Sequence, residues 1–269
     1  MSRGRRLFRR QATLLRDAGV DSFEAVLAIV EDEGQPRELR LAACWELGYG
    51  KNRPSRDNVA RAVGALLNVC GTGQRELTMQ AANALVGIGS NRALLPLIRL
   101  LQQASSAATR EAAAYALGFL ADQRALVPLI RTLEDGSEHS LVRAQAAEAL
   151  GELAQTLRET RTKRPIRPLL AALRDRSPDV RFWACYALSG FRDRRALPAL
   201  RKLIRDRAVV KGWWSVGREA RWAIAVLERD PRADALWQSN SRMAVRPRRK
   251  AVRKRRGRLG RSTPGLSTR

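Results

Sequence analysis

The sequence has few of the residues on which common catalytic and metal sites depend. Its 269 residues include one histidine, His139, and three cysteines that lie far apart. One imidazole excludes a histidine-rich metal site, and the chain contains no Ser-His-Asp set, phosphate-binding loop or glycine-rich dinucleotide turn. We therefore assign no catalytic residue and expect no metal and no cofactor, with His139 at the surface.

Two further absences bear on location. Cys44 and Cys185 sit among alanines in helix-like segments, which is typical of small buried residues in a reducing compartment. No apolar run approaches the roughly 18 residues that a membrane span needs, and no apolar segment follows the charged N-terminus. These features favour a cytoplasmic protein with no integral membrane part. Its oligomeric state is left open.

Acidic residues are missing from the C-terminal end of a chain whose net charge is +25. Residues 17–157 carry 13 basic and 17 acidic groups, residues 158–229 carry 19 and seven, and residues 246–261 carry ten and none. A disordered tail with this density of positive charge attracts phosphates strongly. An anionic partner is therefore expected, although the excess of arginine over lysine also allows a bias in genomic composition.

An internal repeat defines the architecture. The stretch ALVGIGSNRALLPLIRLL from Ala84 aligns with ALGFLADQRALVPLIRTL from Ala116 and ALSGFRDRRALPALRKLI from Ala187. The alanine-rich segments start at positions 40, 78, 110, 143, 181 and 218, which are 38, 32, 33, 38 and 37 residues apart. Each unit is long enough for two helices, so about six helical hairpins are predicted.

Both halves of a unit have helical periodicity. Leu94, Leu97, Ile98 and Leu101 recur at helical spacing, and the prolines at 96, 128, 168 and 198 fall in or near the first turn of a helix, where no ladder hydrogen bond is lost. The alanines of the second helices allow neighbouring backbones to approach closely. No segment has a significant strand pattern.

These residues resemble the HEAT repeats, in particular the short class first noted in phycobilisome lyase subunits. VRAQAAEALGEL (142–153) and TREAAAYALGFLADQRALVPLIRTLED (109–135) are similar to its repeat unit. The resemblance covers roughly residues 20–229 and implies an all-α, right-handed α-solenoid with alanine-rich second helices on its concave side. We expect a basic N-terminal segment at 1–19, helical or capping, and a linker with a disordered basic tail at 230–269.

The resemblance also implies a structural role for the arginines that begin the second helices. In the family this arginine bonds to an aspartate that ends the preceding helix, and Asp175 fits that role for Arg181. Ser137, Ala104 and Gly34 stand at the equivalent offset in other units. Arg40, Arg110 and Arg143 are therefore less well explained.

Two enzymatic alternatives remain on the same fold. One is a bilin-lyase-like subunit. The other is a glycosylase of alkylated DNA bases, with Asp179, Asp193 and Arg181 near the aromatic side chains of Phe182 and Trp183. No motif of either enzyme is recognisable. A deoxyhypusine-hydroxylase-like di-iron site is excluded because its His-Glu pairs are missing.

Eight of the 14 aromatic residues lie in the basic region 158–241. Aromatic rings beside arginines suit both nucleic acids and protein interfaces, while a cap on the open end of the stack is the structural alternative. The candidate partner-binding aromatic residues are Trp183, Tyr186, Trp213 and Trp214.

We interpret the protein as a non-catalytic scaffold that binds a protein partner on its concave face. Its basic C-terminal half and tail are expected to contact nucleic acid or another polyanion. The candidate polyanion-binding residues in the repeats are Arg201, Lys202, Arg205 and Lys211. Those in the tail are Arg246, Arg248, Arg249, Lys250, Arg253, Lys254, Arg255 and Arg256.

Overall fold

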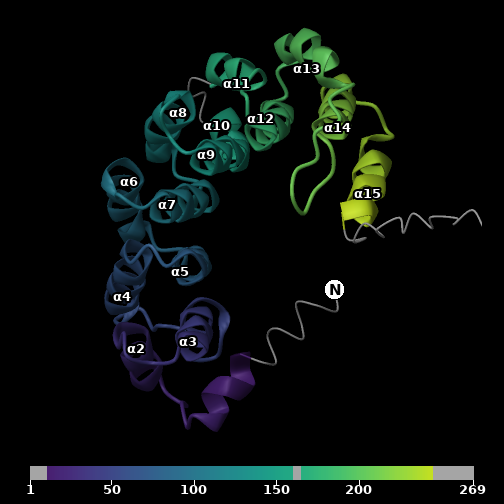
Figure 1. The fold of residues 1–269 in the computed structure, drawn as a ribbon. Helices are drawn as coiled ribbons and strands as arrows, with labels where there is room; N and C mark the ends of the chain where they lie inside the picture. The colour runs from purple at the N-terminus through teal and green to yellow at the C-terminus, as the bar shows by residue number, and fades with distance from the viewer. Residues whose placement is uncertain (1–10, 160–164, 245–269) are drawn as a thin grey trace, which may run out of the picture.

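The computed structural model describes residues 11–159 and 165–244. Within these ranges the chain consists of helices and short turns that follow one another around an open arc (Figure 1). No strand forms in this part of the chain, where a single antiparallel bridge joins Val209 and Ser215. The predicted all-α solenoid is confirmed.

Six hairpins make two layers of helices. The outer layer consists of α2 (Phe23–Glu31), α4 (Val59–Gly71), α6 (Leu94–Gln103), α8 (Leu126–Glu134), α11 (Ile166–Ala172) and α13 (Leu197–Leu203). The inner layer consists of α3 (Arg37–Tyr49), α5 (Arg75–Ile88), α7 (Ala107–Leu120), α9 (Ser140–Glu152), α12 (Pro178–Phe191) and α14 (Val216–Glu228). The inner helices line the concave side, as expected for the alanine-rich segments (Figure 1).

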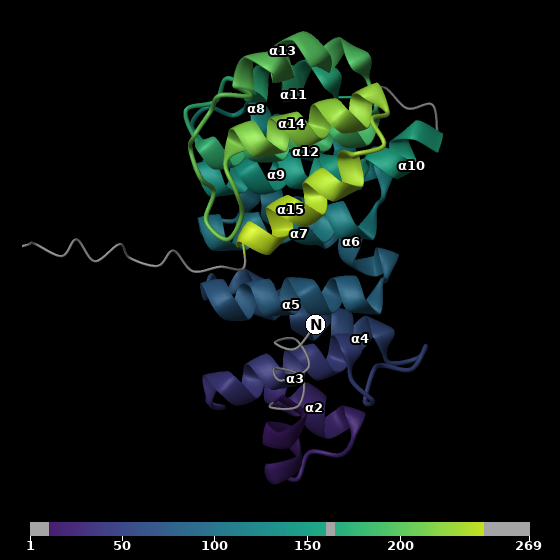
Figure 2. The same ribbon diagram turned by 90° about the vertical axis from the view of Figure 1, so that its right-hand side faces the viewer.

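Further helices lie outside the hairpin pattern. Residues 11–17 are helical, and α10 (Ala154–Glu159) follows α9 directly. Helix α15 (Ala233–Ala244) occupies the start of the expected linker, packs on α14 and lies in front of the inner layer when the concave side faces the viewer (Figure 2). The linker therefore begins with an ordered helix, because Trp237 contacts aromatic rings of the last repeat. Residues 245–269 lie outside the described residues.

The turns between repeats explain the Arg-Ala-Leu signature. Three of the outer helices are preceded by the short 3₁₀ turns η1 (Asn91–Ala93), η2 (Gln123–Ala125) and η3 (Arg194–Ala196). The side chains of Ser90, Asp122 and Asp193 cap these turns by accepting a backbone N–H two residues further on. The four prolines fall within the first three residues of α6, α8, α11 and α13, as predicted.

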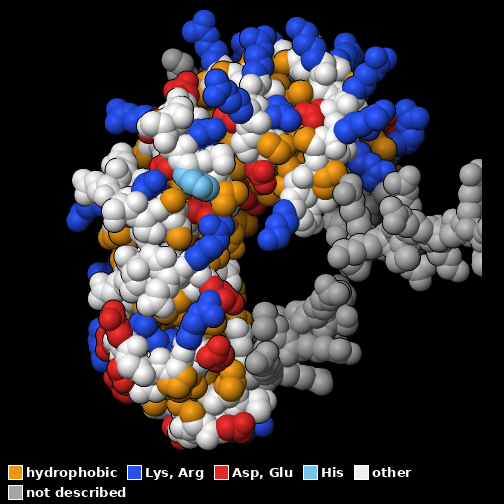
Figure 3. Space-filling model, viewed as in Figure 1, with side chains coloured by type: hydrophobic (Ala, Val, Ile, Leu, Met, Phe, Trp, Pro, Cys, Tyr) orange, Lys and Arg blue, Asp and Glu red, His pale blue; other side chains and the backbone are white. Residues whose placement is uncertain are grey.

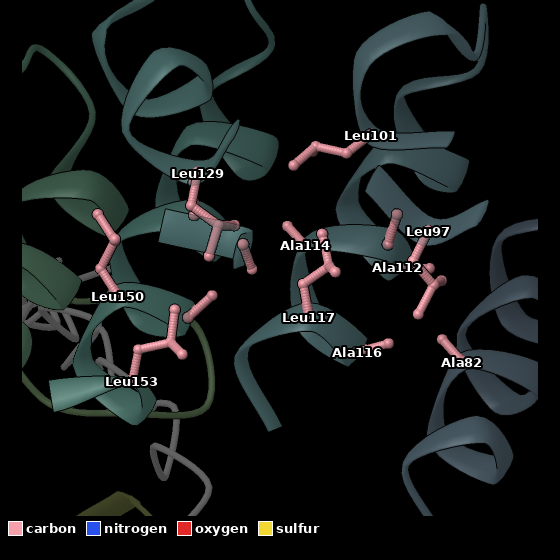
Figure 4. Packing of buried hydrophobic residues seen from close by; sticks show 14 of the residues in the cluster. Ala82, Leu97, Leu101, Ala112, Ala114, Ala116, Leu117, Leu129, Leu150 and Leu153 are labelled. Atoms are coloured by element: carbon pink, nitrogen blue, oxygen red, sulfur yellow. The ribbon is translucent and has the colours of Figure 1, made fainter. Parts of the chain in front are cut away.

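Leucines of the outer helices fill the space beside the alanine-rich inner helices. Leu97 and Leu129 are fully buried, and Figure 4 shows Leu97 of α6 beside the alanines of α7. The inner helices touch so closely that a Cβ atom on Gly118 would lie 2.7 Å from the Cα atom of Ala149. Small residues at this position therefore set the spacing between repeats.

The three cysteines are buried inside this core, as expected for small structural residues. Burial raises the pKa of the Cys44 thiol to about 12 and that of Cys185 well above its usual value. Protonated thiols of this kind are poor nucleophiles. None of the helices in the described ranges is both long and apolar enough to cross a membrane.

Candidate binding surfaces

The arginines that begin the inner helices join neighbouring repeats. Arg110 donates to the carbonyl oxygens of Ala104 and Ser105 at 2.6 and 2.9 Å, which satisfies carbonyls left free at the end of α6. The same guanidinium donates to both carboxylate oxygens of Glu138 in the next repeat, at 2.6 and 2.8 Å. This side chain therefore caps one helix and clamps two repeats.

Arg143 and Arg181 form the same two kinds of contact. The expected pairing of Arg181 with the Asp175 carboxylate, however, is wrong. Arg181 donates to the backbone carbonyl of Asp175 at 2.8 Å, whereas the Asp175 carboxylate accepts from Arg143 of the preceding repeat at 3.0 Å. The carboxylate partner of Arg181 is Asp206, at 2.9 Å. The Arg181 guanidinium donates to carbonyls that follow the outer helix of its own hairpin, so its carboxylate partner comes from the next repeat.

A row of polar and aromatic side chains follows the inner helices at the N-terminal end of the arc. The Tyr49 hydroxyl donates to the carbonyl oxygen of Asn83 at 2.9 Å, and the Tyr115 hydroxyl donates to Asn83 Oδ1 at 3.1 Å. Tyr49 and Phe119 are 41% and 42% exposed, and the Phe119 ring lies 4.8 Å from that of Tyr115. Rings from α3 and α7, bridged by Asn83 of α5, thus form one partly exposed row.

A cavity of about 860 Å³ opens beside this row. Its edge carries the ion pair between Arg37 and Glu76, and Arg75 pairs there with Glu111 at 2.9 Å. The cavity is lined by Arg37, Gln74, Arg75, Glu76, Met79, Gln80, Asn83 and Tyr115. Most of these lining side chains are polar or charged, and Met79 and Tyr115 supply the apolar surface.

Two glutamates on α9 continue the row. Burial, together with repulsion from Glu152, raises the pKa of the Glu148 carboxyl to about 7, although a hydrogen bond from Gln145 at 2.9 Å opposes this. Glu152 accepts a 2.6 Å hydrogen bond from the Tyr186 hydroxyl. Neither glutamate forms an ion pair with an arginine or lysine among the described residues. The middle of the inner layer is therefore acidic in a strongly basic chain.

Seven aromatic side chains then form a continuous cluster at the C-terminal end of the arc. Trp213 contacts the rings of Phe182, Trp183 and Trp214 with centroid distances of 5.9, 5.2 and 5.4 Å. Many of these contacts are edge-to-face, the geometry that aromatic quadrupoles favour. The cluster consists of Phe182, Trp183, Tyr186, Trp213, Trp214, Trp222 and Trp237.

A buried carboxyl fastens this cluster to α14. The indole N–H of Trp214 donates to Glu219 Oε2 at 2.7 Å, and the Glu219 side chain is fully buried. Burial raises the pKa of Glu219 to about 8, and the hydrogen bond from Trp214 reduces that rise. Glu219 therefore keeps its proton to a higher pH than an exposed carboxyl does, and its hydrogen bond with Trp214 anchors the segment before α14.

The four predicted partner-binding aromatics fall into two groups. Trp183 and Tyr186 are half-buried and Trp213 is 36% exposed, so these three present ring surface to solvent. Trp214 is 4% exposed and can act only by supporting its neighbours. The cluster also packs α15 and the segment before α14 against α12 and α14 on the concave side of the last repeats.

Basic side chains gather over the C-terminal half, where blue side chains crowd the end of the molecule that holds α11 to α14 (Figure 3). Lys202, Arg205 and Lys211 are exposed and form no ion pair with described residues. Arg201 is also exposed, but it pairs with Glu228 at 2.6 Å. The eight predicted tail residues, from Arg246 to Arg256, lie outside the described residues, so the basic surface on view is that of the repeats.

The residues considered for a glycosylase site are not brought together. Asp179 lies in the first turn of α12, whereas Asp193 follows its last turn, about 20 Å away along a helix of this length. Asp193 caps η3 and pairs with Arg195 at 2.6 Å, and Arg181 is held by Asp206. Within the described ranges no three metal-ligating side chains group together. His139 is exposed and caps α9.

Among the residues of the concave row, the sequence prediction included Tyr186 but missed Tyr115, Phe119, Glu148 and Glu152. Tyr115, Glu148 and Tyr186 each stand five residues after the arginine that begins the inner helix, and Phe119 and Glu152 stand four residues later. Reading each column across the aligned repeats, rather than each repeat by itself, would have shown aromatic and acidic side chains at both positions. That signal was present in the sequence.

The sequence matches the family pattern of HEAT repeats over residues 23–118, 94–156 and 151–216. The chain belongs to the HEAT-repeat family. Among curated proteins, none matches the sequence. The HEAT repeats cover all six hairpins as far as the start of α14, so the family accounts for the architecture and leaves the surfaces to be interpreted from their own residues.

Solved structures of repeat proteins are similar in fold. The complex of CpcE and CpcF of phycocyanin lyase from Nostoc sp. PCC7120 is 23% identical with a TM-score of 0.48, and the match covers 63% of this chain and 99% of that one. Human deoxyhypusine hydroxylase is 17% identical with a TM-score of 0.45, over 82% and 92%. A designed armadillo repeat protein in complex with the peptide (KR)4 is 22% identical with a TM-score of 0.49, over 75% and 98%.

Proposed function

We propose that this HEAT-repeat protein is a non-catalytic scaffold that binds a protein partner along its concave side and a polyanion along its basic C-terminal half. The observation that carries the first part is the set of partly exposed aromatic side chains on the inner helices and on the segment before α14. Tyr49, Phe119 and Trp213 expose between 36% and 42% of their surface. Exposed aromatic residues are enriched where proteins bind one another.

The acidic centre of the row narrows the choice of partner. Glu148 and Glu152 lie one turn apart on α9, where two like charges destabilise a helix by a few tenths of a kcal/mol. A basic side chain of a bound protein would relieve that repulsion. Aromatic rings on either side of the glutamates would also favour a cation.

The second part of the proposal rests on charge. Residues 158–229 carry 19 basic and seven acidic groups, and in the described part of this range Arg181, Arg195 and Arg201 form ion pairs with carboxylates. The remaining exposed arginines and lysines suit phosphate groups, without reading base sequence. The compartment is proposed to be the cytoplasm.

A pull-down from lysate with and without nuclease treatment separates the two parts. A protein partner of the concave side should remain bound after nuclease, whereas material held through nucleic acid should be released. The variant Phe119→Ser/Trp213→Ser removes two exposed rings from the concave side and should lose the nuclease-resistant partner.

The matched control removes exposed apolar side chains from the outer layer. Leu95 and Val127 are 53% and 54% exposed on α6 and α8, and Leu95→Ser/Val127→Ser should keep the partner. Equal loss in both variants would contradict a concave binding site. Retention of the partner by the Phe119/Trp213 variant would contradict it as well.

A further inference from the structure

The turn that follows each inner helix has the same construction in three repeats. An aspartate accepts the backbone N–H of an arginine two residues later and also pairs with that arginine's guanidinium. The pairs are Asp122 with Arg124 at 2.7 Å, Asp193 with Arg195 at 2.6 Å, and Asp230 with Arg232 at 2.8 Å. In each of these turns the aspartate and the arginine therefore pair with each other.

The residue before this aspartate, or before Ser90 in an earlier turn, has a left-handed backbone. Gly89 and Ala121 occupy the position in the earlier turns with φ values of 67° and 53°, whereas Arg192 and Arg229 occupy it in the last two with 52° and 58°. A left-handed backbone costs a residue with a Cβ atom about 1 kcal/mol or more, and an arginine side chain does not reduce that cost. The helix end does not demand a positive charge either, since α7 ends with Ala121.

A third arginine joins these two. Arg194 directly follows Asp193, at the position that Gln123 occupies after Asp122. All three of Arg192, Arg194 and Arg229 are exposed, and none forms an ion pair with described residues. The last two turns therefore contain three arginines whose side chains form no ion pair within the turn.

These three arginines line one cavity of about 630 Å³ between the end of α12 and the end of α14. Two acids also line it. Asp230 is already held by Arg232, whose hydrogen bonds lower the pKa of the Asp230 carboxyl to about 2. Asp234 is the remaining carboxylate. The cavity is lined by Arg192, Arg194, Ala225, Val226, Leu227, Arg229, Asp230, Ala233 and Asp234.

We propose that Arg192, Arg194 and Arg229 form a pocket that binds a phosphoryl group. Guanidinium groups donate in a planar fork that matches two oxygens of a phosphate, and three of them around one cavity exceed the charge of Asp234. The pocket goes beyond the polyanion surface proposed above, because it would take a single phosphoryl group and lies at a turn rather than along α13.

The test uses the full chain and inorganic pyrophosphate, with binding measured by calorimetry at low salt. The variant Arg192→Gly/Arg194→Gln/Arg229→Gly gives these turns the residues found at the same positions in earlier repeats. Glycine is the preferred residue at a left-handed position, so the variant should fold at least as stably as the parent. We expect its affinity for pyrophosphate to fall at least about tenfold, because charged hydrogen bonds are lost.

The control variant removes the same amount of charge from exposed arginines elsewhere, as Arg16→Gln/Arg56→Gln/Arg99→Gln. Its affinity should stay within about twofold of the parent, since screening weakens charges at a distance. Equal losses of affinity in the two variants would overturn the pocket and leave only an effect of net charge. Unchanged pyrophosphate binding in the glycine variant would overturn it too.

A second arm identifies the source of the phosphoryl group. A short single-stranded RNA should displace pyrophosphate if the pocket takes a phosphate of a polynucleotide. If it does not displace pyrophosphate, while the glycine variant still loses binding, the pocket takes a free phosphorylated molecule. Loss of RNA binding in the variant Arg201→Gln/Lys202→Gln/Arg205→Gln/Lys211→Gln, with pyrophosphate binding retained, would show that the pocket and the basic surface of the repeats act separately.

Discussion

Individual residues in this protein combine structural and electrostatic roles at the same positions of the repeat. Arg110 and Arg143 each end one helix and bind the acid of another repeat, and both side chains are less than one-fifth exposed. Removing one partner of such a pair leaves the other charge poorly solvated, which costs more than an exposed ion pair contributes. Arginine at these positions is therefore a structural residue, despite the net charge of the chain.

Glu219 makes stability depend on pH. Its pKa is about 8 in the folded protein and 4.5 ordinarily, so between these values the unfolded chain releases a proton that the folded chain retains. The free energy of unfolding should consequently fall as pH rises from about 4.5 to about 8. Glu219→Gln keeps an oxygen for the Trp214 indole and should show a smaller fall, measured by denaturant unfolding across this range.

Glu148 contributes in the same direction up to its pKa of about 7, so some pH dependence should remain in the Glu219 variant. The control is Glu134→Gln, an exposed carboxyl at the end of α8. That variant should follow the profile of the parent. An identical profile in the Glu219→Gln variant would show that this carboxyl is already ionised in the folded protein.

At the scale of helices, contact between inner helices depends on residues without side chains. The α7–α9 contact is close because Gly118 meets the backbone of Ala149. Gly118→Ala should destabilise the protein by about 1–2 kcal/mol, because overpacking costs more than the gain in helix propensity. The free energy of unfolding in denaturant measures this effect.

Gly64 is the matched control for that substitution. It lies in α4, is exposed, and has no atom within 4 Å of the position that a Cβ would occupy. Gly64→Ala should therefore stabilise the protein by about 0.5–1 kcal/mol through helix propensity alone. If both variants were stabilised, the close approach of α7 and α9 would be absent in solution.

The fold was predictable where the residues that make its packing contacts recur in each repeat unit. Small residues, leucine spacing and prolines recur in each unit, so the six hairpins and their two layers could be predicted from the sequence. Helix α15 was missed because it lies outside the repeat and its short apolar pattern was assigned to the linker. Trp237 fixes this helix through contacts with distant residues such as Trp222, which no repeat pattern shows.

The candidate surfaces were predictable in part, for a related reason. The basic and aromatic C-terminal region was evident from composition, and Trp213 is exposed as a binding residue must be. Burial of Trp214 depends on Glu219, and the arginine pocket depends on two turns that lie 37 residues apart in sequence. Sequence reasoning locates such side chains on an element without showing which of them share a space.

The whole molecule separates two kinds of surface. Aromatic and acidic side chains follow the inner layer, while lysines and arginines crowd the far end of the arc around α11 to α14 (Figure 3). A partner on the concave side and a polyanion on the basic end would therefore contact different residues. The aromatic cluster lies on the concave side of the last repeats, so the proposed partner and the proposed polyanion would not compete for the same side chains.

The share of polyanion binding carried by each basic segment can be measured from its salt dependence. For a single-stranded nucleic acid, each phosphate contact adds about 0.7 to the slope of log affinity against log salt. Replacing Arg201, Lys202, Arg205 and Lys211 with Gln should lower that slope by up to about 3, and replacing the eight tail residues from Arg246 to Arg256 by up to about 6. Fluorescence anisotropy of a labelled RNA over a salt series gives both slopes.

The two replacements make distinct predictions about how the segments act. If repeats and tail both contact the same strand, their reductions in slope should add, because each contact neutralises a separate phosphate. If tail replacement alone abolishes the salt dependence, the basic face of the repeats makes no phosphate contacts. Its arginines then have only a structural role in the folded protein. An unchanged slope after tail replacement would instead remove the tail from the binding surface and leave the repeats as the sole site of phosphate contact.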